Sequence, residues 1–128
     1  MENFILEATR STPAVHFDAT TLVLEMKGES YPENSAKFFG PMFAWVTEAM
    51  AQGGTAPLVM NLELAYFNSS SSKILFNLFD ILDKAAASGR AVTINWRYLE
   101  ENEMALECGE EFQNEVANAV FNLVPLGG

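Results

Sequence analysis

The chain has 128 residues, a length that corresponds to a single domain. Hydrophobic residues make up 49% of the sequence, which is enough to bury a core and too much for a disordered chain. Seven Lys and Arg residues stand against seventeen Asp and Glu residues, and the resulting net charge of −10 argues against binding to nucleic acid or to an anionic membrane surface.

The N-terminus and the single cysteine together predict a cytoplasmic protein. Residues 1–7 have neither the basic start nor the apolar stretch of a secretory signal. No hydrophobic segment approaches the roughly 20 apolar residues that span a bilayer. Cys108 alone cannot form an internal disulfide or a multi-cysteine zinc site, and we expect it to be an inert packing residue in a reducing compartment.

The first part of the chain predicts a β-hairpin followed by a loop. Val15–Asp18 and Leu22–Lys27 are short β-rich segments, and the second alternates between two faces. The turn residues of 28–35 then predict a loop.

An amphipathic helix follows, because apolar residues recur at helical spacing from Phe38 to Met50. Pro41 lies inside this pattern. Since proline is well tolerated only in the first turn of a helix, we expect an initial turn and then the main helix, which begins near Gly40-Pro41 and ends at Gly53-Gly54.

The middle of the chain predicts a central strand and a second long helix. Leu58–Phe67 is apolar at nearly every residue except Asn61 and Glu63, which is typical of a strand buried in the centre of a sheet. Beyond the serines that follow, apolar residues from Ile74 to Ala86 repeat every three or four positions, and Gly89 is expected to end this helix.

The last part predicts a strand at Ala91–Tyr98, an acidic helix at Glu101–Glu115 and an edge strand at Val120–Val124. The predicted order is therefore β-β-α-β-α-β-α, with a final β. This order indicates an α/β fold in which helices pack on a mixed sheet. We expect one domain over residues 1–128, with residues 1–10 as a candidate flexible segment.

The residue types that usually carry catalysis or bind metals form no recognisable constellation. His16 is the only histidine, so a catalytic triad or a multi-histidine metal centre would depend on it alone. The acidic clusters Glu100-Glu101-Glu103 and Glu110-Glu111 follow no calcium-loop pattern and are typical of a charged helix face. We therefore predict no enzyme activity, no metal and no cofactor. The alternative from another class is a small enzyme that uses His16 and the acidic helix.

The serine run Ser69-Ser70-Ser71-Ser72, between the central strand and the second helix, is the remaining candidate site. The first four N–H groups of a helix lack intrahelical partners, so Asn68 or Ser69 can act as the N-cap. A phosphate on this run would meet free N–H groups, the positive end of the helix dipole and Lys73. Four serines exceed what capping requires, yet local physics alone favours capping over a phosphorylation switch.

Three segments resemble the SiaC family of bacterial regulatory phosphoproteins: Ser30–Ser35 (SYPENS), Tyr66–Ser71 (YFNSSS) and Phe79–Leu82 (FDIL). The resemblance runs from about Ser11 to the last helix and also places the chain near the STAS domains of anti-sigma-factor antagonists. It implies a STAS-like fold and a phosphoacceptor directly after the asparagine, which is Ser69 here.

Threonine occupies the phosphoacceptor position in the family, and this departure keeps Ser70 and Ser71 as alternative acceptors. We expect Asn68, Ser70, Ser71 and Lys73 to form the surroundings of the phosphate.

The resemblance also implies partners. A dedicated kinase would phosphorylate the protein, and a metal-dependent phosphatase would reverse the modification. The unphosphorylated form would bind and activate a GGDEF diguanylate cyclase, which raises cyclic di-GMP and promotes biofilm formation. The alternative in the same class is an anti-sigma-factor antagonist that controls transcription through an anti-sigma kinase. We expect Tyr31, Pro32, Glu33 and Asn34 to contact the partner, since their loop and the serine run both lie where a strand gives way to a helix.

Overall fold

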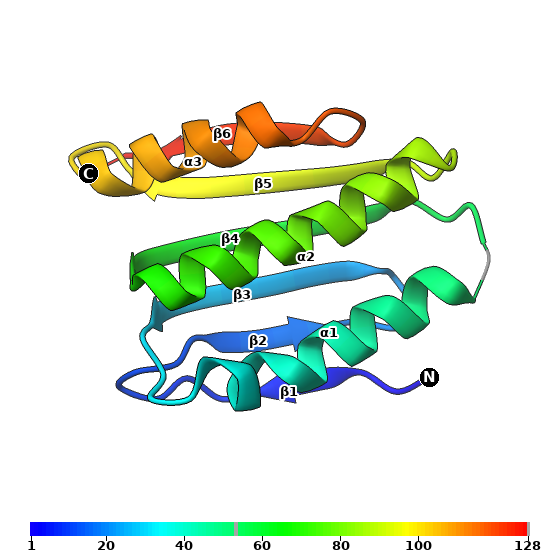
Figure 1. Cartoon of the computed structure of the whole chain (residues 1–128), viewed down its shortest axis with the longest axis horizontal. Coiled ribbons are helices and arrows are strands. Elements are labelled where there is room, and N and C mark those ends of the chain that lie inside the picture. The colour runs from blue at the N-terminus through cyan, green and yellow to red at the C-terminus, as the bar shows by residue number, and fades with distance from the viewer. Residues whose placement is uncertain (53, 128) are drawn as a thin grey trace.

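The computed structural model describes residues 1–52 and 54–127, which form one six-stranded sheet and three helices (Figure 1). The strands are β1 (Phe4–Leu6), β2 (Ala14–Phe17), β3 (Val23–Ser30), β4 (Leu58–Phe67), β5 (Val92–Leu99) and β6 (Val120–Leu126). The helices are α1 (Ser35–Ala51), α2 (Ser69–Ala87) and α3 (Glu103–Glu115). The predicted α/β class is confirmed, and the order β-β-β-α-β-α-β-α-β adds β1 to the predicted elements.

The strands lie in the sheet in the same order as in the chain. β1, β2 and β3 pair antiparallel, which confirms the predicted hairpin, and β3 to β6 pair parallel. Each parallel connection contains one helix. Successive right-handed crossovers in one direction place their helices on the same face of the sheet, and Figure 1 shows all three helices there. The N-termini of the helices therefore all lie at the edge where the parallel strands end.

The core lies between this helical layer and one face of the sheet. In β4, Leu58, Met60, Leu62 and Leu64 are buried, whereas the residues between them are only half-buried. The largest fully buried side chains are Trp96, Phe17, Phe39, Phe79 and Phe112. The prediction that 58–67 is a central strand is confirmed, but helices cover only one of its two faces.

The helix-free face carries a row of amide side chains across the parallel strands. Asn61 donates from Nδ2 to Glu25 Oε2 at 3.3 Å, Asn95 donates to Asn61 Oδ1 at 2.9 Å, and Asn122 donates to Asn95 Oδ1 at 3.0 Å. These four residues pair directly across β3, β4, β5 and β6. The row explains why a polar residue interrupts the apolar stretch of β4, and cross-strand pairs of this kind stabilise the strand register.

The prediction that α1 begins at Gly40-Pro41 is wrong, because the helix begins at Ser35. Asn34 is the N-cap, and its side chain accepts a hydrogen bond from the Lys37 N–H at 3.0 Å. Pro41 therefore lies in the second turn, where its missing N–H leaves the Lys37 carbonyl without a helical partner. Lys37 and Pro41 are both exposed, so water can satisfy that carbonyl.

α1 ends at Ala51, with Gln52 as the C-cap. Of the Gly53-Gly54 pair that was expected to end the helix, Gly53 lies outside the described residues. The stop predicted at Gly89 is confirmed, since α2 ends at Ala87 and Gly89 has a φ of +108°, a backbone conformation that favours glycine. No helix in the described part of the chain combines the length and apolar character that a membrane span requires.

Strand β1 is the element that the sequence pattern did not reveal, because three residues are too few to show a period. Phe4 pairs with Phe17 of β2, and the two rings lie 5.9 Å apart. Nearby, Trp45 of α1 donates from Nε1 to the Glu2 carbonyl at 2.7 Å. These contacts hold the first residues of the chain on the edge of the sheet.

Candidate functional site

The serine run and the loop 30–35 meet at the edge where β3 and β4 end. The backbone N–H of Asn68 donates to the Ser30 carbonyl at 3.0 Å. The Ser71 hydroxyl donates to the same carbonyl at 3.0 Å, and the Ser30 and Ser71 hydroxyls are 2.9 Å apart. The loop leads directly into α1 and the serine run into α2, so two helix N-termini open at this one edge.

Asn68 is the N-cap of α2. Its side-chain oxygen accepts from the Ser71 N–H at 2.9 Å and from the Ser70 hydroxyl at 3.1 Å, and its carbonyl accepts from the Ser72 N–H at 3.0 Å. The choice between Asn68 and Ser69 as cap is thereby resolved in favour of Asn68. Ser69 is the first residue of the helix and has no capping role.

The serines of the run differ in how accessible their hydroxyls are. Ser71 is 0% exposed and hydrogen-bonded to Ser30, and Ser72 is half-buried. Ser70 is exposed, but its hydroxyl contacts Asn68 and lies 2.8 Å from the hydroxyl of Ser35. Ser69 is exposed, and its hydroxyl makes no hydrogen bond to any described residue. The Ser69 hydroxyl is therefore accessible from solvent without breaking a contact.

The starts of α1 and α2 beside Ser69 carry lysines, although the chain as a whole is acidic and Glu33 is exposed in the adjoining loop. Neither α1 nor α2 has an acidic residue in its first turn. Lys73 lies one turn after Ser69, Lys37 lies in the first turn of α1, and both are exposed. The ion pairs found within the described residues are Lys27–Glu63 and Lys84–Asp80, so neither Lys37 nor Lys73 is neutralised there. A phosphate on Ser69 would lie at the positive end of the α2 dipole, with Lys73 one turn further along the helix.

The loop residues expected to contact a partner differ in exposure. Glu33 and Asn34 are exposed, although the side chain of Asn34 is engaged as the cap of α1. Tyr31 is half-buried, and its ring packs edge-on against Tyr66 with the centroids 5.7 Å apart. Pro32 is buried and therefore shapes the loop instead of offering a contact surface.

A group of exposed apolar residues at the same edge was not found from the sequence. Tyr66 at the end of β4, Leu99 at the end of β5 and Met104 at the start of α3 are 44%, 41% and 39% exposed. We call Tyr31, Tyr66, Leu99 and Met104 the carboxyl-edge surface. Tyr31, Tyr66 and Leu99 lie at or near the ends of strands, and this position is the one signal in the sequence that could have indicated them.

A break in the register between β3 and β4 turns Tyr66 outward. Gly28 pairs with Leu64 and Glu29 with Tyr66, so Ala65 has no partner in β3. Because of this extra residue, Phe67 packs in the core at 5.5 Å from the Trp96 ring, and Tyr66 faces solvent. Strict alternation from Leu64 would have buried Tyr66 and exposed Phe67.

The other residues considered for chemistry are not brought together. His16 is exposed on β2 opposite Glu25, and no group of three His, Cys, Asp or Glu side chains in residues 1–52 and 54–127 is arranged to hold a metal ion. Burial, followed by the charges of Glu111 and Glu107, raises the pKa of the Cys108 thiol. The thiol therefore stays protonated at neutral pH and is a poor nucleophile.

Comparison with known proteins identifies the family. Residues 6–126 match the model of the SiaC family regulatory phosphoproteins, a longer match than the resemblance suggested. An uncharacterized protein of Pseudomonas aeruginosa strain UCBPP-PA14 is 39% identical over 115 residues, which cover 90% of each chain.

Two solved structures agree with this match. SiaC of Pseudomonas aeruginosa is 35% identical with a TM-score of 0.90, covering 98% of this chain and 100% of that one. A crystal structure of the diguanylate cyclase SiaD in complex with its activator SiaC, from the same organism, contains a chain that is 36% identical with a TM-score of 0.90, covering 96% and 99%. This chain therefore belongs to the SiaC family of regulatory phosphoproteins.

Proposed function

We propose that this chain is a phosphorylation-controlled partner-switching protein of the cytoplasm. In its unphosphorylated form it binds and activates a GGDEF diguanylate cyclase, which raises cyclic di-GMP and promotes biofilm formation. A cognate kinase phosphorylates Ser69 and releases the partner, and a metal-dependent phosphatase resets the switch. The observation that carries the proposal is the exposed, unbonded hydroxyl of Ser69 beside the carboxyl-edge surface.

The fold itself can accept a phosphate on Ser69. The modification adds about −1.5 to −2 charges at neutral pH and three acceptor oxygens. At the first residue of α2 these oxygens meet unpaired N–H groups and the positive end of the dipole, an interaction that stabilises by about 0.3–1 kcal/mol in exposed positions. Lys73 adds a positive charge one turn further along the helix. The phosphate therefore leaves the folded chain intact, and its effect falls on the partner.

The same phosphate strongly disfavours a partner that covers the carboxyl-edge surface. Covering Tyr66, Leu99 and Met104 removes water from their surroundings, and taking an anion out of water without a compensating partner costs several kcal/mol. Since about 1.4 kcal/mol corresponds to a tenfold change in affinity, a penalty of about 3 kcal/mol lowers affinity roughly 100-fold. That is enough to turn binding off.

Relatives support the choice of a diguanylate cyclase as partner. The similar SiaC chain of Pseudomonas aeruginosa is described as the activator of SiaD and forms a crystallised complex with it. No comparable observation favours an anti-sigma factor. A regulatory role also agrees with the scattered positions of His16, Cys108 and the acidic clusters in the described structure.

The test of the switch uses purified protein, its cognate kinase and a GGDEF partner. Ser69→Ala should keep the wild-type affinity and stimulation of cyclic di-GMP synthesis but resist the kinase, and Ser69→Asp should lower affinity at least tenfold. Ser70→Ala is the matched control and should still be phosphorylated. Equal phosphate incorporation into wild type and Ser69→Ala would show that the acceptor is another residue. Capture of an anti-sigma factor in place of a GGDEF protein would favour the alternative partner.

A second test addresses the surface. Tyr66→Ala should weaken partner binding about tenfold, because a few anchors, tyrosines among the commonest, contribute most of the energy of an interface, and Leu99→Ala should weaken it by less. Val120→Ala is the control, since Val120 is also an exposed large apolar residue but lies at the start of β6, at the opposite edge. Calorimetric titration that gave equal losses for Val120→Ala and Tyr66→Ala would contradict the assignment of this surface.

A further inference from the structure

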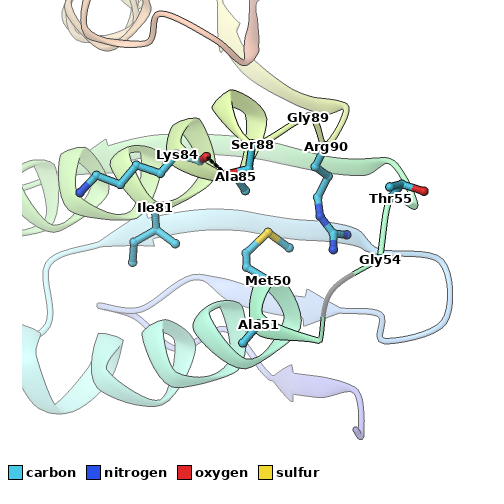
Figure 2. A pocket seen from close by; sticks show the side chains of 10 residues that line it. All are labelled: Met50, Ala51, Gly54, Thr55, Ile81, Lys84, Ala85, Ser88, Gly89 and Arg90. Atoms are coloured by element: carbon cyan, nitrogen blue, oxygen red, sulfur yellow. Dashed lines mark hydrogen bonds between the residues drawn. The ribbon is translucent and has the colours of Figure 1, made fainter.

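A second candidate site lies at the opposite edge of the sheet, where α1 and α2 end. A cavity of about 630 Å³ opens between the last turns of the two helices, Gly54-Thr55 and residues 88–90 (Figure 2). Small-molecule sites commonly have volumes of about 300–1,000 Å³. The apolar part of its wall comes from Met50, Ala51, Ile81 and Ala85. The cavity is therefore large enough for a small organic molecule.

Arg90 supplies the charged group of this cavity. The residue is only 9% exposed, and its guanidinium points between Met50 and Gly54 in Figure 2. Nη1 donates to the Ala56 carbonyl at 3.1 Å. Among the described residues no carboxylate lies within 4.0 Å of the guanidinium. Arginine is almost never so buried without a counter-charge, so this one is poised to pair with an anion.

The remaining guanidinium nitrogens are open to the cavity. Within the described residues, every fully buried side-chain nitrogen or oxygen has a hydrogen-bond partner. The one hydrogen bond of the Arg90 side chain uses Nη1, so its other nitrogens retain contact with solvent, which enters through the cavity. Gly54 lies beside Nη2, where an added Cβ would be in ordinary van der Waals contact at 3.8 Å. The guanidinium thus has donors with no acceptor among the described residues, and those away from Gly54 reach solvent through the cavity.

The lining is positive in a chain that is strongly acidic. Two of the seven Lys and Arg residues, Lys84 and Arg90, line the cavity, but none of the seventeen Asp and Glu residues does. Lys84 stands at the rim, with its ammonium 3.0 Å from Asp80. In Figure 2 the Lys84 ammonium points away from Arg90, so Arg90 is the binding group of the cavity.

The partial negative charges of the two helix C-termini repel an anion, but the full positive charge of Arg90 attracts it more strongly. A helix end carries about half a negative charge. In α2 the Lys84, Ala85 and Ala86 carbonyls already accept hydrogen bonds from the N–H groups of residues 88–90. The guanidinium keeps a full charge that no carboxylate of the described residues neutralises.

We propose that this cavity binds a small molecule that carries a phosphate group beside an apolar moiety. The guanidinium fork matches two phosphate oxygens in a bidentate pair. The wall of Met50, Ile81 and the two alanines covers the rest of the molecule. This site is independent of the switch at Ser69, because it lies at the other end of α2.

Amide NMR titrations of the whole chain test the proposal, with inorganic phosphate and phenyl phosphate as probes at constant ionic strength. Both should shift the amides of residues 54–56 and 88–90 along saturating curves, and phenyl phosphate should bind at least fivefold more tightly because of the apolar wall. Arg90→Gln should weaken both at least tenfold. Lys73→Gln, which removes an exposed charge at the other end of α2, should change neither by more than twofold.

A second variant keeps the test decisive if Arg90→Gln fails to fold. Ala51→Phe changes an exposed residue at the rim and fills the apolar side while Arg90 remains. It should weaken phenyl phosphate more than fivefold and leave inorganic phosphate within twofold. Shifts that rise linearly without saturation, that persist in Arg90→Gln, or that centre on residues 69–72 would overturn the proposal.

Discussion

The two ends of α2 present opposite chemistry on one helix. At its N-terminus, Asn68 and the exposed Ser69 offer neutral donors and acceptors, and the nearby ammonium groups are on flexible, exposed side chains. At its C-terminus, Arg90 places a permanent and almost fully buried charge. The helix dipole accounts for both arrangements, since its positive end favours an added anion and its negative end favours a cation. The N-terminus of α2 therefore suits the negative charge of the proposed phosphate, and its C-terminus suits the permanent positive charge of Arg90.

The difference also concerns what each end can change. In the proposed switch the charge at Ser69 depends on a covalent modification, so its surroundings must be stable with and without the phosphate. The charge at Arg90 is always present and already contributes to the fold through its hydrogen bond to Ala56. Four predictions test this contrast.

The largest expected effect separates two serines of the same run. Ser71→Asp should lower the free energy of unfolding by about 3 kcal/mol or more, because Ser71 is fully buried against Ser30 and an uncompensated buried charge costs that much. Denaturant unfolding followed by circular dichroism measures the change. Ser69→Asp serves as the control and should not destabilise. Equal stability of the two variants would mean that the run is not held in the core as described.

The next effect compares the caps of the helix. Asn68→Ala should cost about 1 kcal/mol of unfolding free energy, since the side chain satisfies the Ser71 N–H. Ser88→Ala at the other end should cost only a few tenths of a kcal/mol, because its exposed hydroxyl bonds a carbonyl that also has a backbone partner. Equal losses of unfolding free energy in the two variants, measured by thermal and denaturant unfolding, would contradict the view that a side chain caps only the N-terminus of α2.

The third prediction is a pH dependence that belongs to the C-terminal half of α2. The carboxylate of Asp83 accepts from the N–H groups of Ala117, Asn118 and Ala119 at 3.2, 2.7 and 2.8 Å. Burial raises the pKa of Asp83, but the hydrogen bonds from the three N–H groups lower it by more. The pKa in the folded state therefore lies below the ordinary value. This contribution is complete above the unfolded pKa of about 3.9 and is lost as pH falls through the folded pKa.

Denaturant unfolding at a series of pH values should therefore show stability falling below about pH 4. Asp83→Asn should reduce that fall by less than about 1 kcal/mol, since the side chain is partly solvated. Part of the fall should remain, because the N–H groups of Thr21 and Thr20 also lower the pKa of Asp18. An unchanged pH profile in Asp83→Asn would show that the loop before β6 does not depend on this charge.

The smallest effect tests the dipole directly. Ser69→Asp should stabilise the chain by about 0.5 kcal/mol at low salt, and Ser88→Asp should destabilise it by a similar amount, because both residues are exposed and differ in the helix end they occupy. Both effects should shrink at high salt. Thermal unfolding at two salt concentrations measures them. Changes of the same sign would contradict the dipole as the cause.

Most of the secondary structure was predictable because it follows from periodicity. The apolar alternation of β5 and the three- and four-residue spacing of α2 are local properties, and both elements lie where they were predicted. The start of α1 was not predictable in this way. Pro41 indicated a first turn, but the cap at Asn34 and the solvent around Lys37 allow the helix to begin before it.

The location of the candidate site was also encoded locally, as four serines between an apolar strand and an amphipathic helix. Their different roles were not, because each depends on residues far along the chain. Ser71 is buried against Ser30, and Ser70 contacts Ser35, which leaves Ser69 as the exposed hydroxyl without a bond. Tyr66 faces solvent because of a register shift against β3, and Arg90 faces a cavity because two helices end beside it. Periodicity and turn chemistry depend on a few neighbouring residues and can therefore be predicted from the sequence. Burial and pairing between distant segments exist only once the sheet has assembled.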